Sequence, residues 1–362
     1  MRLLIYDETP VGHHPFYMRH TVATADRLRR HAHLVYSYPH DLNLNGVQYV
    51  PLPPSPWTRP LRLCDRRLRT KLLVWYKWRR LDRLMQQVRA DRVLLMNAQE
   101  FLEPGIVPHV TWEWVPLYMH PRGTRRSGER LPVEPLQSRQ CRFIYTLDEG
   151  VTDQLVTAIG KEVRHFPDLA EADQDMESPL VADARRRSKG RPIIAALGTI
   201  THHKNIRLLL RVASLRSDWF FVVAGALHPS KLSQDTLHAL RGAESLPNVL
   251  YHVESISDGT LNAMSAQSAV LYGCYLDFPH SSNKLTKACL VRVPIVASDR
   301  DYMGEVVRKF GIGAVCDPTD AVALEQAIAS LLAAGPPNPR WEAYLDRNSV
   351  DSLQDSLTRL FQ

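Results

Sequence analysis

The sequence has no long hydrophobic run and few cysteines. The longest apolar cluster in the first hundred residues covers only positions 72–76, whereas a membrane-spanning helix needs about 20 apolar residues. Asp7 and Glu8 end the short apolar stretch at the N-terminus, so we expect no secretory signal peptide. The five cysteines are odd in number and include no Cys-x-x-Cys pair. They therefore indicate reduced thiols in a cytoplasmic protein and no metal site.

The composition is that of an ordinary globular protein. Apolar residues make up 44% of the 362 residues and charged residues 23%, which argues against disordered, collagen-like and coiled-coil chains. The net charge of +7 is uneven, because residues 1–167 hold 25 Lys and Arg against 16 Asp and Glu, whereas the remainder holds 20 against 22. The excess of positive charge in the first half therefore predicts an anionic partner for that half.

Strand-like and helix-like segments alternate along the chain. This alternation predicts an α/β fold with mostly parallel sheets and helices on both faces. The polar segment 168–190 interrupts it and is interpreted as a linker. We predict two doubly wound, Rossmann-like domains facing a central cleft, over 1–167 and 168–340, and a helix over 341–362 that returns to the first. The expected strands lie at 2–6, 33–36, 47–50, 92–96, 107–112, 142–146, 192–198, 220–225, 248–253, 269–272 and 294–298.

Three loops that follow expected strands carry the candidate site. Ligands of doubly wound sheets bind at the carboxyl ends of the strands. Gly12 and His13 lie in the first loop, Gly198 and Lys204 in the second, and a helix begins near Ser282 in the third. Glycine permits a close approach, a lysine reaches a phosphate, and free helix N–H groups bind anions. Ordinary turns, a solvated lysine and a well-capped helix are the alternatives.

These motifs together resemble a known family. The segments 282–288 and 293–299 are similar to the C-terminal signature of the retaining glycosyltransferases of GT-B fold, a family with many sucrose-, mannosyl- and lipopolysaccharide-forming enzymes. Segment 198–204 looks like that family's glycine–lysine element. The pair Gly12-His13 resembles its N-terminal glycine loop.

The resemblance implies that the second domain binds a nucleotide-sugar donor, which is a substrate, and that neither a metal nor a cofactor is needed. Helix dipoles and cations would offset the charge of the leaving diphosphate. The first domain would bind the acceptor. The resemblance places the donor nucleotide and its phosphates at Gly12, Gly198, Thr199, Lys204, Ser282, Asn283, Lys284, Leu285 and Thr286.

The sequence departs from the family pattern at three places. Lys287 stands where the family often has a ribose-binding glutamate, and the nearest acid is Asp277, so these two residues mark the ribose region. Thr199 stands where an arginine is frequent. The family's first-domain histidine is out of register. Three residues are the catalytic candidates in its place, with strand or loop-surface roles as the alternative for the first two: Glu113, His120 and His13.

Residues 59–92 hold twelve Lys and Arg against three acids, and apolar residues recur there at steps of three or four. That spacing predicts a basic amphipathic helix. Three interpretations stay open: a solvated helix packed on the sheet of the first domain, a helix that docks on an anionic membrane surface, and a helix that binds nucleic acid or another polyanion.

We therefore predict a metal-independent glycosyltransferase that moves a sugar to an envelope, polysaccharide or natural-product acceptor, with retention. One alternative is a non-catalytic relative that serves as a scaffold or binds sugars. Another is a protein directed to nucleic acid or another polyanion by its basic first domain. The expected location is the cytoplasm, with peripheral contact to the inner face of the membrane. The sugar, the base, the acceptor and the oligomeric state are left open.

Overall fold

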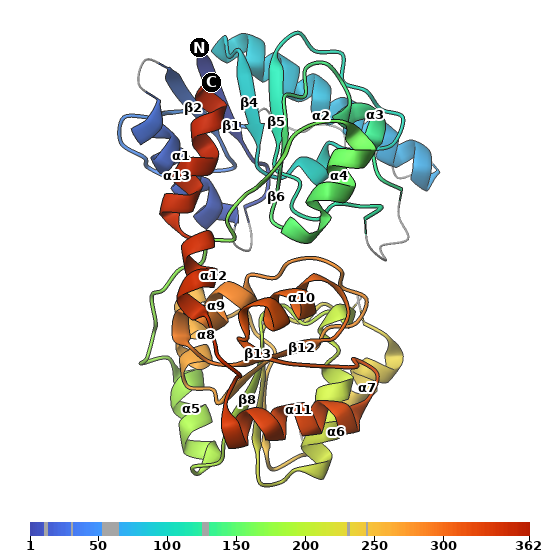
Figure 1. Cartoon of the computed structure of the whole chain (residues 1–362), viewed down its shortest axis with the longest axis vertical. Coiled ribbons are helices and arrows are strands. Elements are labelled where there is room, and N and C mark those ends of the chain that lie inside the picture. The colour runs from blue at the N-terminus through green and yellow to red at the C-terminus, as the bar shows by residue number, and fades with distance from the viewer. Residues whose placement is uncertain (11–13, 30–31, 53–64, 125–129, 230–231, 244) are drawn as a thin grey trace. The chain divides into compact units, whose positions relative to one another are not determined.

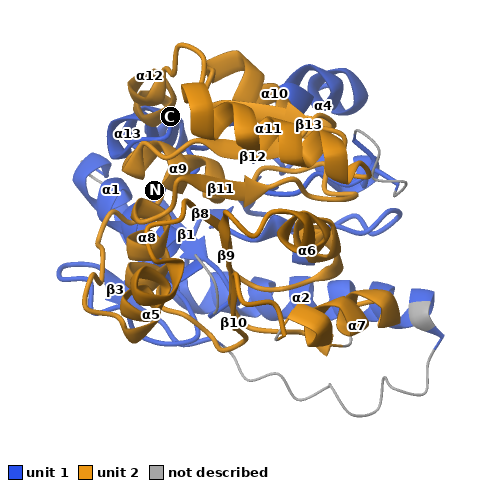
Figure 2. Ribbon diagram, turned by 90° about the horizontal axis from the view of Figure 1, so that it is seen from below, with its two compact units in different colours: residues 1–169, 348–362 blue, residues 170–347 orange. Residues whose placement is uncertain are grey.

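The chain folds into two compact units. The computed structural model describes residues 1–362 except 11–13, 30–31, 53–64, 125–129, 230–231 and 244 (Figure 1). Unit 1 consists of Met1–Leu169 together with Asn348–Gln362, and unit 2 of Ala170–Arg347 (Figure 2). No helix in the described ranges is long and apolar enough to cross a bilayer.

Unit 1 is built on a parallel sheet whose strand order is β3-β2-β1-β4-β5. Short runs rich in Leu, Ile and Val form the inner strands because both faces of a parallel sheet are buried. A two-stranded parallel sheet, β6-β7, lies in the same unit. The strands are β1 (Arg2–Tyr6), β2 (His33–Ser37), β3 (Gln48–Tyr49), β4 (Arg92–Leu95), β5 (Glu113–Pro116), β6 (Ile144–Thr146) and β7 (Val163–His165).

Helices cover both faces of the unit 1 sheet. One core packs side chains of α2 and α4 against the sheet, and the other packs those of α1 and α13 against its opposite face. Helix α13 comes from the end of the chain and contacts α1. The helices are α1 (His14–Leu28), α2 (Arg66–Val88), α3 (Val133–Leu136), α4 (Thr152–Ile159) and α13 (Val350–Thr358).

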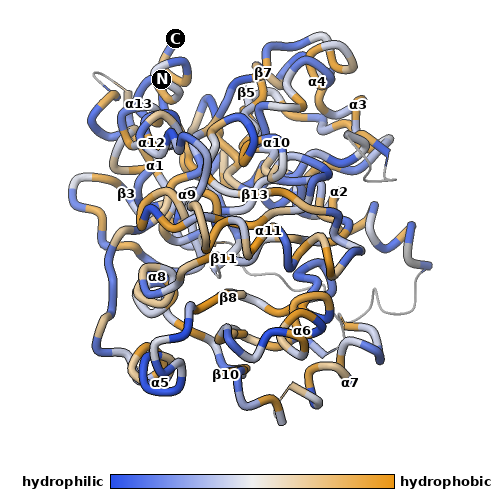
Figure 3. The backbone as a smooth tube through the Cα atoms, turned by 60° about the horizontal axis from the view of Figure 1, so that its bottom comes forward, coloured by the Kyte–Doolittle hydropathy of each residue, from blue (hydrophilic) through white to orange (hydrophobic). Residues whose placement is uncertain are grey.

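Unit 2 is a six-stranded parallel sheet in the order β10-β9-β8-β11-β12-β13. Numbered within the unit, this is the order 3-2-1-4-5-6 of doubly wound nucleotide-binding sheets. Figure 3 shows that the tube is hydrophobic along β8, whereas it is mostly hydrophilic along α5. The strands are β8 (Ile193–Leu197), β9 (Phe220–Ala224), β10 (Val249–His252), β11 (Val270–Gly273), β12 (Ile295–Ser298) and β13 (Gly313–Cys316).

Two cores flank the unit 2 sheet. Helices α5, α8, α9, α10 and α12 supply one core, and α6, α7 and α11 supply the other. Their bounds are α5 (Pro179–Ser188), α6 (Ile206–Leu215), α7 (Gln234–Ala243), α8 (Asp258–Ala266), α9 (Lys284–Val291), α10 (Asp301–Phe310), α11 (Ala321–Ala334) and α12 (Trp341–Arg347). The predicted fold class, α/β with two doubly wound parallel sheets, is confirmed.

Two details of the prediction were wrong. Residues 107–112 form no strand, and the strand of that region begins at Glu113. Pro108 lacks the N–H that a ladder needs, so it disfavours a strand there. The segment 341–362 does not return to unit 1 as a whole. Helix α12 packs on α9 within unit 2, and only the residues from Asn348 onward belong to unit 1.

Candidate functional site

The carboxyl ends of β8 and β11 meet at the point where the strand order of unit 2 reverses. In sheets of this type that point is where ligands bind. The chain leaves β8 through Gly198, whose φ is +89°. Gly225, which follows β9, has a φ of +144°, and a Cβ placed there would lie 2.2 Å from the carbonyl oxygen of Gly198. Two glycines are therefore required for these loops to pass each other closely.

Lys204 reaches back over this loop. Its Nζ donates a hydrogen bond of 2.5 Å to the hydroxyl of Tyr275 and lies 4.4 Å from the centre of that ring. A Cβ built on Gly198 would stand 3.9 Å from the same Nζ. Because Tyr275 follows β11, it holds the Lys204 ammonium at the strand-order reversal.

A second lysine lies beside the first. Lys284 opens helix α9, and its Nζ donates 3.0 Å to the carbonyl oxygen of Leu197, the last residue of β8. Burial, and then the charges of Lys204 and Lys287, lower the pKa of Lys284 well below its ordinary value of 10.5. The carboxyl end of β8 thus combines a concentration of ammonium groups with a helix N-terminus, which is an environment that favours an anion.

The remaining predicted phosphate residues lie around the start of α9. The Ser282 carbonyl accepts 2.9 Å from the Leu285 N–H, and Asn283 is the N-cap residue. The Leu285 side chain is fully buried in the core. The Thr286 hydroxyl lies 3.4 Å from the hydroxyl of Tyr344 in α12. Leu285 and Thr286 therefore anchor the helix through their side chains, and the Leu285 N–H is taken by the Ser282 carbonyl.

Thr199 and the two ribose-region residues, Asp277 and Lys287, are differently placed. Thr199 is exposed beside Gly198, and Asp277 is exposed in the loop after β11 with a φ of +49°. Lys287 is buried and turned toward α8, where its Nζ donates 2.6 Å to Asp258 and 3.0 Å to Asn262. Its charge is therefore compensated within the protein by Asp258.

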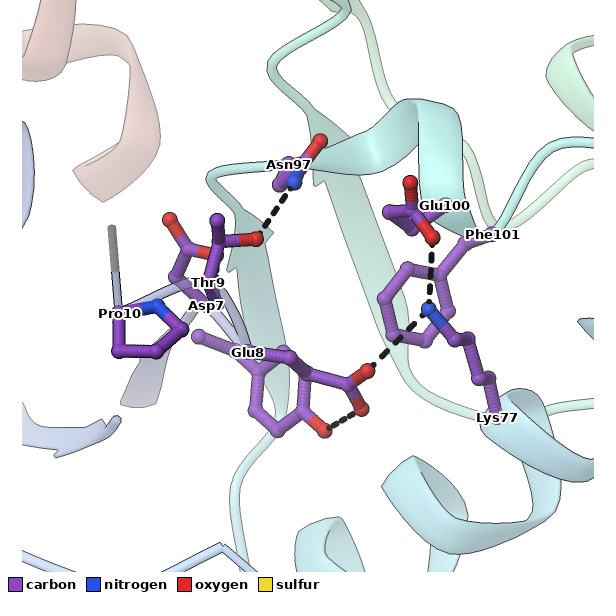
Figure 4. A pocket seen from close by; sticks show the side chains of 9 residues that line it. Asp7, Glu8, Thr9, Pro10, Lys77, Asn97, Glu100 and Phe101 are labelled. Atoms are coloured by element: carbon purple, nitrogen blue, oxygen red, sulfur yellow. Dashed lines mark hydrogen bonds and ion pairs between the residues drawn. The ribbon is translucent and has the colours of Figure 1, made fainter. Parts of the chain in front are cut away.

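Unit 1 has a cavity of about 310 Å³ at the corresponding reversal of its own strand order (Figure 4). The loops that follow β1 and β4 form it, together with one side chain from α2. Carboxylates, a hydroxyl, an amide and an ammonium line it, which suits a ligand rich in hydroxyl groups. The lining residues are Tyr6, Asp7, Glu8, Thr9, Pro10, Lys77, Asn97, Glu100 and Phe101.

Glu8 is the centre of a polar network in this cavity. Its carboxylate accepts 2.5 Å from the Tyr6 hydroxyl, lies 3.3 Å from the Lys77 ammonium, and forms a close ion pair with Arg80. Lys77 also lies 2.9 Å from Glu100. Burial, and then the Glu8 charge, raise the pKa of Tyr6 well above its ordinary value, so the phenol stays protonated and donates. The network fixes these side chains before a ligand arrives.

The two catalytic candidates that the structure describes, Glu113 and His120, are not brought together. Gly12 and His13 lie outside the described residues. His120 is half-buried in the loop after β5, at the carboxyl edge of the sheet, where the cavity also lies. Glu113 is the first residue of β5 and therefore stands at the opposite, amino edge.

The surroundings of Glu113 also argue against catalysis. Burial raises its pKa, but hydrogen bonds from Arg142 and Arg92 outweigh burial, so the pKa lies below the ordinary value. Such a carboxylate is a weak proton acceptor. Glu113 therefore ties two arginines to the amino edge of the sheet, and its catalytic role stays a prediction.

Sequence reasoning missed Glu8, Lys77, Asn97 and Tyr275 as site residues. A signal existed for two of them, because Glu8 and Asn97 each lie two residues after a short apolar strand. No local signal marks Lys77, which sits in the middle of α2. In the described ranges, no group of three or more His, Cys, Asp or Glu is placed to hold a metal ion.

Comparison with known proteins finds a family model that matches most of unit 2. A family model described as Glycosyl transferases group 1 matches residues 181–346. No curated protein sequence matches the chain.

Several solved structures share the fold over the whole length. Sucrose-phosphate synthase from Thermosynechococcus elongatus is 13% identical with a TM-score of 0.71, covering 99% of this chain and 98% of its own. WaaG, a glycosyltransferase involved in lipopolysaccharide biosynthesis, is 13% identical with a TM-score of 0.66 and 100% coverage of both chains. HepE of Anabaena, in complex with UDP-glucose, is 10% identical with a TM-score of 0.67 and 99% coverage of both. The chain has the GT-B fold, and its residues 181–346 match the model of the glycosyl transferases group 1 family.

Proposed function

We propose that this protein transfers a sugar from a nucleotide-diphosphate-sugar donor, with retention and without a metal ion. The acceptor is an envelope, polysaccharide or natural-product molecule. The proposed location is the cytoplasm, with peripheral contact to the inner face of the membrane.

The observation that carries the proposal is the pair of lysines at the carboxyl end of β8. Lys204 is held over Gly198 by Tyr275, and Lys284 opens α9 against the carbonyl of Leu197. Ammonium groups and helix N–H groups aimed at one place stabilise the charge that develops on a leaving diphosphate. They supply by charge alone what a divalent cation supplies in other enzymes.

The unit 1 cavity supports the acceptor half of the proposal. Asp7, Glu8 and Glu100 offer carboxylate oxygens to hydroxyl groups of a sugar or polyol, and Thr9 offers a hydroxyl. Because Glu8 is bound by Tyr6 and two cations, it keeps its position when the cavity is empty. Preorganised groups of this kind bind with less loss of conformational entropy.

A non-catalytic scaffold or sugar-binding protein is the second candidate, favoured by one observation. Lys287, paired with Asp258, occupies the position where the family often has a carboxylate that binds the ribose. A lysine donates to hydroxyl groups and cannot accept from them. A donor would therefore bind without a carboxylate contact to its ribose hydroxyl groups. For the second candidate we expect binding without turnover.

The first experiment measures thermal stability with UDP, GDP, ADP and TDP. A nucleotide at 100 times its Kd adds about 2.7 kcal/mol to the stability of the state that binds it. We expect one nucleotide to raise the melting temperature and Lys204→Ala to remove the effect. Lys189→Ala is the matched control, because Lys189 is exposed just before β8, at the opposite edge of the same sheet. No stabilisation by any nucleotide would contradict the proposal.

The second experiment measures turnover with the sugar nucleotide of the base selected above. We expect slow donor hydrolysis without acceptor, an unchanged rate with a chelator, and release of the sugar with its anomeric configuration retained by NMR. A chelator-sensitive rate would overturn the metal-independent chemistry, and inversion would overturn retention. Nucleotide binding with no turnover on any sugar and acceptor offered would favour the scaffold.

A further inference from the structure

Helix α2 carries an apolar face that the core does not use. Its later turns bury Val74, Trp78 and Leu81 against the sheet of unit 1. Leu68, Leu72 and Trp75 are instead 52%, 37% and 52% exposed. Their spacing of four and three places them on one side of the helix. The apolar stripe expected from the sequence is therefore divided into a buried part and an outward part.

Basic side chains surround the outward part. Arg67, Arg69, Lys71, Arg79 and Arg83 are all exposed. The guanidinium of Arg79 lies 5.3 Å from the centre of the Trp75 ring. No acid stands between Asp65 and Asp82 in the sequence. The face of α2 formed by these five basic residues with Leu68, Leu72 and Trp75, here called the α2 face, is therefore strongly cationic and partly apolar.

We propose that the α2 face docks unit 1 on an anionic lipid bilayer. Cations beside aromatic and aliphatic side chains match the headgroup zone, where phosphates meet the first methylene groups. Nucleic acid would attract the cations but leave Leu68 and Leu72 in water. A protein partner would have to be both acidic and apolar over the same small area. Charge complementarity and the exposed leucines together favour the bilayer.

The same helix also reaches the cavity of unit 1. Lys77 and Arg80 hold Glu8 there, and Lys77 is only two residues beyond Trp75. Two residues turn a helix by about 200°, so the Lys77 side chain points away from the side of α2 on which Trp75 lies. The cavity therefore lies on the far side of α2 from the docked face, and docking leaves its lining untouched.

The first arm of the test uses the full chain and removes the apolar part of the α2 face. Co-sedimentation is measured with vesicles of phosphatidylcholine containing phosphatidylglycerol, and with vesicles of phosphatidylcholine alone. We expect Leu68→Ser, Leu72→Ser and Trp75→Ser together to weaken binding to the anionic vesicles at least about tenfold. The control is Leu215→Ser with Val322→Ser, two exposed apolar residues of unit 2, which we expect to bind as the parent does.

The second arm removes the charges. Arg69→Glu, Lys71→Glu and Arg79→Glu together should abolish binding, and added salt should weaken binding of the parent. Arg211→Glu, Arg241→Glu and Lys309→Glu, all exposed in unit 2, make the same change of charge as a control. Loss of binding in the charge variant alone, with the serine variant unaffected, would mean a simple polyanion site and would overturn the proposal. Equal binding to both kinds of vesicle would overturn it as well.

Vesicle binding and sugar transfer fail separately in these assays. If the protein sediments with anionic vesicles but binds no nucleotide, the docking proposal is supported and the transferase proposal is contradicted. A protein that binds a nucleotide but not vesicles would do the reverse. If both hold, an acceptor embedded in anionic vesicles should be glycosylated faster than its water-soluble analogue, and the serine variant should lose that advantage.

Discussion

The lysines at the carboxyl end of β8 impose an electrostatic cost on the empty protein. Burial disfavours the charged form of Lys284 most, and the charges of Lys204 and Lys287 add to the penalty. A diphosphate would relieve the repulsion by supplying negative charge at the same place. The site is therefore arranged to gain more from an anion than separate surface lysines would.

The depressed pKa of Lys284 predicts how binding responds to pH. Between that pKa and 10.5, the folded protein holds fewer protons than the unfolded chain, so stability rises as pH rises through this window. A diphosphate favours the protonated amine. We therefore expect nucleotide binding to take up protons and to strengthen as pH falls through the window.

Calorimetry in two buffers with different ionisation enthalpies measures this uptake. Lys284→Met should remove the uptake and weaken binding. Lys309→Met serves as the control because Lys309 is exposed on α10. Proton release in the parent, or uptake that survives in Lys284→Met, would show that another group titrates.

Gly225 should tolerate no side chain. Its φ of +144° is rare for other residues, and a Cβ would lie 2.2 Å from the Gly198 carbonyl oxygen. We expect Gly225→Ala to lower the free energy of unfolding by at least about 2 kcal/mol, measured by denaturant unfolding. Gly242→Ala is the matched control, because a Cβ there meets nothing within 4 Å in helix α7. It should raise stability slightly, since alanine favours helix; equal effects of the two changes would contradict the close approach.

The residues that sequence reasoning placed well are those fixed by a strand that ends nearby. Gly198 and Lys204 follow β8, so a correct strand put them at the right edge of the sheet. Glu113 was misplaced for the same reason. A strand over 107–112 would have put Glu113 just after its end, at the carboxyl edge of the sheet. Strand β5 instead begins at Glu113, which therefore lies at the amino edge. The partners of Lys287 were beyond prediction, because Asp258 and Asn262 lie on another helix.

At the scale of elements, α2 shows why one apolar stripe can have two uses. The spacing of the stripe was evident in the sequence, and the helix formed over Arg66–Val88. The spacing of the apolar residues does not predict which turns of α2 lie over the sheet of unit 1. The boundary between buried and outward turns depends on residues far along the chain, such as Trp112 and Trp114, which pack under the later turns.

The start of α2 depends on its N-cap. The Asp65 carboxylate accepts from the backbone N–H groups of Arg67 at 2.9 Å and Leu68 at 3.4 Å. Asp65→Ala should cost about 1 kcal/mol, speed amide exchange in the first turn of α2, and weaken vesicle binding. Asp320→Ala removes the equivalent cap of α11 and should leave vesicle binding unchanged. Parallel losses in both variants would mean that the N-cap effect is not specific to α2.

At the scale of the whole molecule, the last residues complete the first unit. Leu353, Leu357 and Leu360 are fully buried in the same core as α1. Arg92 donates to the carbonyl of Leu360, and Tyr145 donates to that of Ser356. The sequence predicted a helix near the end of the chain, but the residue at which the chain leaves unit 2 depends on tertiary packing.

A single buried leucine tests this assembly. Leu353→Ala should cost about 2–5 kcal/mol through the cavity it leaves. Because Leu353 packs only in unit 1, amide exchange should rise in β1 and β4 and stay unchanged in β8 and β9. Leu324→Ala, equally buried on α11, should give the opposite pattern. Exchange that rises in both units for either variant would mean that they unfold as one.

The divided makeup of unit 1 has a consequence for biosynthesis. Residues 348–362 leave the ribosome only after all of unit 2 has been made. Until then the hydrophobic surface under α13 has no cover, while unit 2 already has every residue it needs. Unit 1 therefore cannot complete its core as its own first residues emerge, which is the usual course for an N-terminal domain: it waits for a segment that is translated after unit 2.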